Sequence, residues 1–154
     1  MSFIAIPEET PGGSLANSSG FWPDIDSSAA RSSMRINEMV TQERLEHALA
    51  LAMAYVNDRL RAFRELQQAA GYTELADVPA EAIAGQSVKI LRYKEAVYSW
   101  ATAYLVEQYA TLDVRNAGQT KAEDLLPTPD SYRRDCYWAL QDIKSLPRSF
   151  VELI

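Results

Sequence analysis

Apolar residues recur at helical spacing in the first half of the sequence. Residues 41–70 predict one long helix, because a single apolar stripe follows steps of three and four residues. The stripe consists of Leu45, Leu49, Ala52, Val56, Leu60 and Phe63. Thr41 is a suitable N-cap for this helix, and Gly71 is a natural stop.

Two shorter helices are predicted at the ends of the folded part. Asp24 or Asp26 can cap a first helix that runs to about Ile36. Thr128 can cap a last helix. Pro129 stands at the first position of that helix, where the backbone N–H that proline lacks would have no partner within the helix. The expected core face of the last helix consists of Tyr132, Cys136, Ala139, Leu140 and Ile143.

A third long helix, over residues 87–113, is apolar on two faces. One face carries Ile90, Val97, Ala101 and Tyr104, and the other carries Leu91, Tyr98, Leu105, Tyr109 and Leu112. Such a helix either lies at the centre of a bundle or is shared with a neighbouring subunit. The pattern alone leaves both interpretations open.

The remaining segments predict linkers. Residues 7–20 are rich in Pro, Gly, Ser and Asn and predict disorder. Residues 114–127 predict an exposed polar loop. Residues 72–86 predict a connector fixed to the core by three apolar side chains, namely Leu75, Val78 and Ile83. No strand pattern recurs in the body of the chain.

These elements predict an all-α fold, a bundle of about four helices with extended segments at both ends. We expect a flexible N-terminal arm at residues 1–20, a helical connector domain at residues 21–146 and an extended C-terminal tail at residues 147–154. The tail closes with five mostly apolar residues, Phe150, Val151, Glu152, Leu153 and Ile154. They are too few to form a core, so they pack back on their own domain or dock into another chain.

Composition narrows the class of protein. A chain of 154 residues with a net charge of −6 forms one domain, and its charge does not indicate a nucleic-acid groove. Met1–Ile6 lacks the basic flank of a signal peptide, and no segment approaches membrane-spanning length. We therefore expect a cytosol-like compartment and no membrane partner.

The residue inventory offers little reactive chemistry. His47 is the only histidine and has no second ligand at zinc-site spacing, and Cys136 has no histidine partner. Phosphate-binding glycine loops are absent as well. We predict no catalytic residue, no metal and no cofactor, and hence no enzyme.

Several motifs follow one another in a specific order over residues 21–154. They are Phe21-Trp22-Pro23-Asp24-Ile25-Asp26, Thr41-x-x-Arg44-Leu45-x-x-Ala48-Leu49, Gly71-Tyr72-x-x-Leu75-x-Asp77-Val78-Pro79-Ala80, Tyr93-x-x-Ala96-Val97-Tyr98, Tyr132-Arg133-Arg134 and Val151-Glu152-Leu153-Ile154. In this arrangement the chain resembles the head completion proteins of contractile-tailed bacteriophages, the gpL-type family.

The resemblance implies a structural virion protein at the head–tail junction, present in the host cytoplasm during assembly. It implies a ring on the portal vertex, commonly twelve-fold, that joins the DNA-filled head to a neck or tail-completion protein. By the same resemblance, Phe150 to Ile154 form the portal-binding tail, and DNA passes the ring without specific binding. The possible subunit interface consists of Tyr98, Leu105, Tyr109, Arg133 and Arg134.

A second hypothesis comes from a different class of protein. Flexible ends on a small helical body are also typical of a regulatory or adaptor module that folds onto a protein partner. Such a module would be a small dimer without affinity for capsid components.

Overall fold

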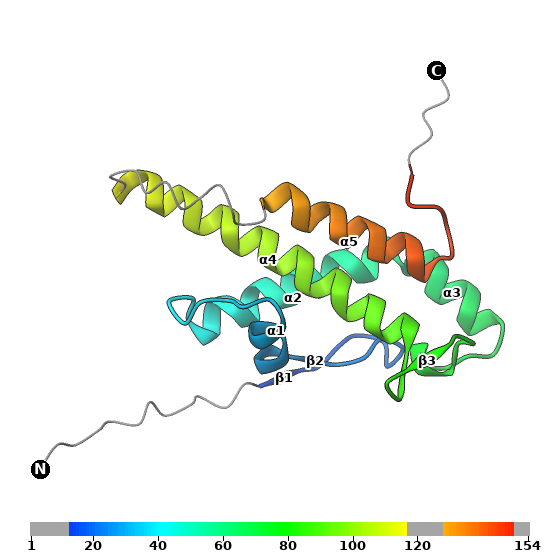
Figure 1. Cartoon of the computed structure of the whole chain (residues 1–154). Coiled ribbons are helices and arrows are strands. Elements are labelled where there is room, and N and C mark those ends of the chain that lie inside the picture. Colours follow the sequence, from blue (N-terminus) through cyan, green and yellow to red (C-terminus); the bar gives the residue numbers. More distant parts are fainter. Residues whose placement is uncertain (1–12, 117–127, 150–154) are drawn as a thin grey trace, which may run out of the picture.

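The computed structural model describes residues 13–116 and 128–149, and this part of the chain is mostly helical (Figure 1). The helices are α1 (Ser27–Ser33), α2 (Gln42–Arg59), α3 (Arg61–Ala69), α4 (Val88–Asn116) and α5 (Pro129–Ile143), with a 3₁₀ turn at Leu75–Asp77. Two antiparallel pairs of two-residue strands accompany them: β1 (Ser14–Leu15) with β2 (Ile25–Asp26), and β3 (Ala82–Ile83) with β4 (Gln86–Ser87). The all-α class is confirmed, with these two small sheets as additions.

Helix α4 is the central element of the fold. It runs the length of the molecule, and both α5 and α2 pack against it (Figure 1). Val97 and Ala101 on one predicted face are fully buried, and Tyr98 and Leu105 on the other are 8% and 5% exposed. The middle of the second apolar face therefore serves the core of the same chain, as expected for a helix at the centre of a bundle, whereas Leu91 at its start is 38% exposed.

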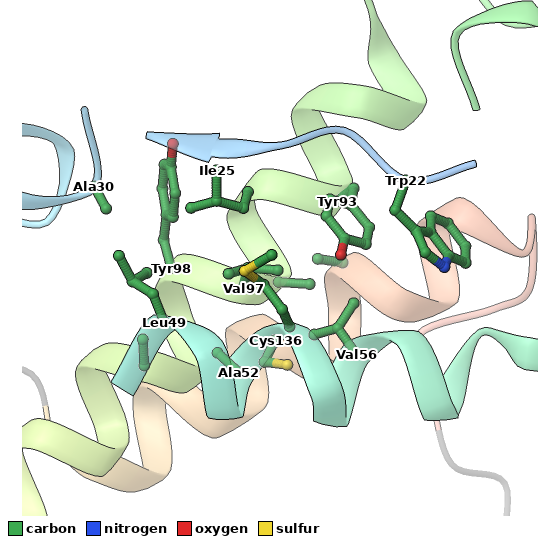
Figure 2. Packing of buried hydrophobic residues seen from close by; sticks show 14 of the residues in the cluster. Trp22, Ile25, Ala30, Leu49, Ala52, Val56, Tyr93, Val97, Tyr98 and Cys136 are labelled. Carbon is green, nitrogen blue, oxygen red and sulfur yellow. The ribbon is translucent and has the colours of Figure 1, made fainter. Parts of the chain in front are cut away.

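The N-terminal segment closes the core on one side (Figure 2). Trp22 stacks on Tyr93 of α4 with ring centroids 5.0 Å apart, and Phe21 meets Trp22 edge-on at 4.7 Å. Phe21 and Ile25 are almost completely buried. Large aromatic side chains therefore hold the N-terminal segment against the helical bundle.

The predicted helix caps are confirmed. Asp26 accepts hydrogen bonds from the backbone N–H groups of residues 28 and 29, and Thr41 accepts one from the N–H of residue 44. Thr128 caps α5 in the same way, with Pro129 at the first helical position. Short polar side chains at these points satisfy donors that the helices leave unpaired.

The single helix predicted over residues 41–70 is wrong. Leu60 separates α2 from α3 with a non-helical backbone (φ −102°, ψ 10°), although neither glycine nor proline stands there. Leu60 is fully buried, whereas no residue of α3 is. The chain bends where its core stripe ends, because tertiary packing contributes more to helix stability than propensity does.

The connector after α3 is partly as predicted. Gly71 has φ +99°, and its N–H and that of Tyr72 bond to the carbonyls of residues 68 and 67, which closes α3. Leu75 and Val78 are buried, but Ile83 is 56% exposed, so its predicted core contact is wrong. Ile83 lies in the β3–β4 pair, which carries it away from the bundle.

The prediction of disorder for residues 7–20 is wrong for the part that the structure describes, residues 13–20. Strand β1 pairs with β2, and Ser27 donates its backbone N–H and its hydroxyl to the carbonyl of Gly13. Composition alone missed this segment because its contacts are polar and distant in sequence. Residues 7–12 lie outside the described residues.

Candidate functional site

A closed ring of hydrogen bonds anchors the N-terminal segment to the bundle. Asn17 donates from Nδ2 to the phenol oxygen of Tyr93 at 2.7 Å, and this phenol donates to Oδ1 of Asn57 at 2.6 Å. Asn57 completes the ring by donating from Nδ2 to Oδ1 of Asn17 at 2.8 Å. Burial raises the pKa of Tyr93, so the phenol stays protonated and able to donate.

A groove rich in aromatic side chains crosses the surface of α2, α4 and α5. The ring of Trp100 stacks between Tyr55 of α2, at 5.4 Å, and Tyr104 of α4, at 5.7 Å. These three rings are half-buried. Beside them is a hollow of about 290 Å³, lined by Tyr55, Trp100, Arg133, Cys136, Tyr137 and Leu140. We call this surface the aromatic groove.

Arginine side chains border the aromatic groove. The guanidinium of Arg59 lies 5.0 Å from the ring centre of Tyr55. Arg133 lines the hollow and forms a 2.7 Å ion pair with Glu107. Tyrosine, tryptophan and arginine are the residues most enriched in the energetic centres of protein–protein interfaces. The groove therefore has the chemistry of a contact with another protein chain.

The residues predicted as a subunit interface fall into two groups. Tyr98 and Leu105 are buried in the core of their own chain, which removes them from the exposed surface. Tyr109 is half-buried, with the guanidinium of Arg44 5.6 Å from its ring centre. The other two, Arg133 and Arg134, are exposed on α5.

Arg134 packs against a second tryptophan rather than against the groove. Its guanidinium lies 4.5 Å from the ring centre of Trp138, and that of Arg148 lies 5.3 Å from the same centre. Cation–π contacts of this kind hold the two arginine side chains against the half-buried ring of Trp138. They place Trp138 next to the point where the chain leaves α5.

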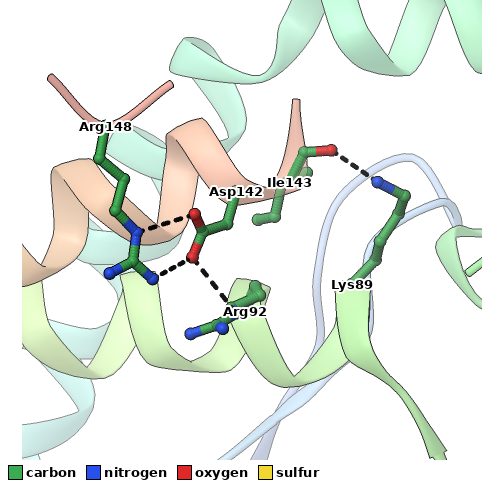
Figure 3. Close-up of polar contacts among 5 residues, drawn as sticks. All are labelled: Lys89, Arg92, Asp142, Ile143 and Arg148. Atoms are coloured by element: carbon green, nitrogen blue, oxygen red, sulfur yellow. Dashed lines mark hydrogen bonds and ion pairs between the residues drawn. The ribbon is translucent and has the colours of Figure 1, made fainter. Parts of the chain in front are cut away.

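A cluster of charged side chains, which we call the polar latch, fixes the chain at the point where it leaves α5 (Figure 3). It consists of Arg92, Asp142 and Arg148. Arg148 donates from Nε and Nη2 to the two carboxylate oxygens of Asp142, at 2.9 and 2.6 Å, and Arg92 of α4 lies 3.4 Å from the same carboxylate. The hydrogen bond from Arg148 is the main cause of the lowered pKa of Asp142, and the two arginine charges add to it. The latch thus joins the chain beyond α5 to α4.

Backbone contacts strengthen the same exit. Ser145 takes a left-handed conformation (φ +57°), and the N–H of Leu146 bonds to the carbonyl of Gln141 at 2.9 Å, which reverses the chain. Lys89 of α4 donates from Nζ to the carbonyl of Ile143 at 2.7 Å, at the carboxyl end of α5 where a cation is favoured (Figure 3). The predicted tail, Phe150 to Ile154, lies outside the described residues.

Reactive chemistry is limited in the described part of the chain. Burial raises the pKa of Cys136 to about 12, which suppresses its thiolate. Among residues 13–116 and 128–149, no group of three His, Cys, Asp or Glu side chains could hold a metal ion. None of the helices seen there has both the length and the apolar character needed to span a bilayer.

Sequence reasoning missed most of these contacts. The polar ring joins residues 17, 57 and 93, and the latch joins residues 92, 142 and 148, so neither leaves a local pattern. The groove left a weak signal. Trp100 and Tyr104 stand four residues apart, which places both on one side of α4.

The fold is that of a small helical protein, and its aromatic groove carries the residue types that are enriched in protein–protein interfaces. The family of phage head completion proteins (GPL) matches residues 16–154. The chain is also 38% identical to the head completion/stabilization protein of Escherichia phage P2 over 151 residues, which are 98% of this chain and 89% of that protein. No solved structure matches.

The chain therefore belongs to the phage head completion protein family. It is a structural component of the phage head and virion, and not an enzyme. This assignment decides between the two hypotheses from the sequence in favour of the structural virion protein.

Proposed function

We propose that this protein completes the DNA-filled phage head by forming a ring on the portal vertex. In this proposal the ring has the symmetry of the portal, twelve-fold, and joins the head to a neck or tail-completion protein at the head–tail junction. Each subunit binds the portal protein through Phe150 to Ile154. Membership of the head completion family supports the general role.

The observation that carries the portal-binding mode is the latch at the end of α5. Arg148 is held by both carboxylate oxygens of Asp142, two residues before the apolar segment begins. A tail that leaves a rigid body from a fixed point loses less conformational entropy on docking than one that starts from a free end. Its four apolar side chains, Phe150, Val151, Leu153 and Ile154, supply the area to bury.

The net negative charge of the chain supports the proposal that DNA passes through the ring without being bound. The chain has 21 acidic and 15 basic residues, a net charge of −6. Proteins that bind the DNA backbone neutralise phosphates with clustered Lys and Arg. A ring of subunits with this net charge repels phosphates rather than retaining them.

Deletion of residues 150–154 tests the portal contact. We expect the truncated protein to keep its helical circular dichroism and its melting temperature, because the latch remains. We expect it to lose co-sedimentation with portal protein and with DNA-filled heads. Glu152→Gln is the matched control, and it should bind because all four apolar side chains remain. Loss of helical signal on deletion would assign the tail to the core, and undiminished binding would exclude it as the anchor.

A further inference from the structure

A second exposed surface differs from the aromatic groove in both charge and shape. Residues 65–88 contain four carboxylates and no lysine or arginine. The four are Glu65, Glu74, Asp77 and Glu81, all exposed, and none of them forms an ion pair with another described residue. Ile83 stands in the same segment with 56% of its surface exposed. We call residues 81–88 the hairpin.

The hairpin holds Ile83 in a defined position. Ala84 and Gly85 have φ of +51° and +76°, the sign that a two-residue type I′ turn requires at both positions. The N–H of Val88 bonds to the carbonyl of Glu81 at 2.9 Å and extends the β3–β4 pair to the start of α4. An apolar side chain on so short and braced a turn needs little ordering to act as an anchor.

The aromatic groove offers the complementary surface. Arg59 lies over Tyr55 and forms no ion pair with any other residue that the structure describes. Arg133 lines the hollow itself. Arg59, together with Arg133 and its ion-pair partner Glu107, therefore borders a cavity of about 290 Å³ with half-buried aromatic walls. An apolar side chain next to carboxylates matches this site in polarity and in charge.

We propose that the hairpin of one copy docks into the aromatic groove of the next copy, with Ile83 as the anchor. The contact uses different surfaces on the two partners, so it is heterologous and can close into a ring. It rests on the ring of the proposed function and names the surfaces that would join its subunits.

The hairpin cannot fill the groove of its own chain. Val88 and Trp100 are twelve residues apart on α4, which corresponds to about 18 Å along the helix axis. The two-residue strands of the hairpin reach only roughly 7 Å from the start of α4. A contact between hairpin and groove therefore requires two copies.

Photo-crosslinking from position 83 tests the contact. Ile83 is replaced by p-benzoylphenylalanine, and the protein is irradiated both as a concentrated solution and when bound to DNA-filled heads that lack it. We expect dimers and higher adducts in which the hairpin peptide is joined to peptides that contain Tyr55, Trp100 or Arg133, identified by mass spectrometry. The same amino acid at Met39, which is 81% exposed in the loop before α2, is the matched control and should not label these peptides.

Charge-reversal variants provide a second measurement. They change exposed side chains, so the substitutions should not disturb folding. Glu81→Arg or Arg59→Glu alone should lower the adduct yield about tenfold, since each places like charges opposite one another. The two changes combined in one chain should restore it. A yield that neither reversal alters would overturn the proposed contact.

The outcomes separate this contact from the proposed function. Heads that bind the protein but give no groove adduct, or only adducts with the portal, overturn the hairpin contact and leave the tail contact standing. Groove adducts in solution from a protein that does not bind heads support the hairpin contact and count against the proposed function.

Discussion

The phenol of Tyr93 donates a 2.6 Å hydrogen bond to the side-chain carbonyl of Asn57 while accepting one of 2.7 Å from Asn17. Tyr93 comes from α4 and Asn57 from α2, so the bond joins two helices of the core. Asn17 also donates to the carbonyl of Pro23 at 2.8 Å. These bonds hold the N-terminal segment against α2 and α4, in a half-buried network in which each of the three side chains has partners.

Tyr93→Phe should destabilise the protein by about 1–3 kcal/mol, since it removes two hydrogen bonds in a half-buried site, the one that Asn17 donates and the one that Asn57 accepts. Urea unfolding followed by circular dichroism measures the change. Tyr72→Phe is the matched control, because no hydrogen bond to the hydroxyl of Tyr72 is seen within the described residues, and its effect should be small. A similar loss in both variants would contradict the role of the polar ring.

Asp142→Asn should remove a pH dependence of stability. Arg148 lowers the pKa of Asp142 in the folded protein, so the unfolded chain binds this proton more tightly. The stabilisation is complete above the unfolded pKa, about 4, and is lost as the pH falls through the lowered folded pKa. Urea midpoints near pH 7 and about pH 3 should therefore converge between wild type and variant at the acidic end.

Asp58→Asn provides the comparison for this measurement. Asp58 pairs with Arg61, but both side chains are 62% exposed. Exposed pairs contribute little to stability. If Asp58→Asn changed the pH dependence as much as Asp142→Asn, the latch would not be its source.

Two helix ends have residues with positive φ, so adding a side chain at one and removing a side chain at the other should change stability in opposite directions. Gly71→Ala should lower stability by about 1 kcal/mol, because φ +99° disfavours any L-residue although the space around Gly71 is open. Ser145→Gly should raise it by up to about 1 kcal/mol, since Ser145 already stands at φ +57°. Thermal unfolding of both variants checks the signs. A loss of stability in Ser145→Gly would show that the side chain of Ser145 makes a stabilising contact.

The thiol of Cys136 should be unreactive in the native protein. With a pKa of about 12, its thiolate fraction near pH 8 is on the order of a thousandfold below that of a free cysteine. A chromogenic disulfide reagent should therefore react slowly until denaturant is added, and then at once. Rapid reaction with folded protein would show that the aromatic groove opens in solution, because Cys136 lines it.

Local patterns determined which segments are helical and several of the helix ends. Thr41, Thr128 and Gly71 mark boundaries by backbone chemistry that acts within one turn, so the sequence suffices to find them. The order of motifs along the chain likewise indicated the family to which it belongs. These features depend on neighbours along the chain.

Only the tertiary structure decided which apolar surfaces stay exposed. It buried Tyr98 and Leu105, exposed Ile83, and bent the chain at Leu60 without any helix-breaking residue. It also fixed residues 13–20 through hydrogen bonds between Asn17 and partners 40 and 76 residues away. Burial and long-range hydrogen bonding depend on where separate helices meet, and a one-dimensional pattern does not record that geometry.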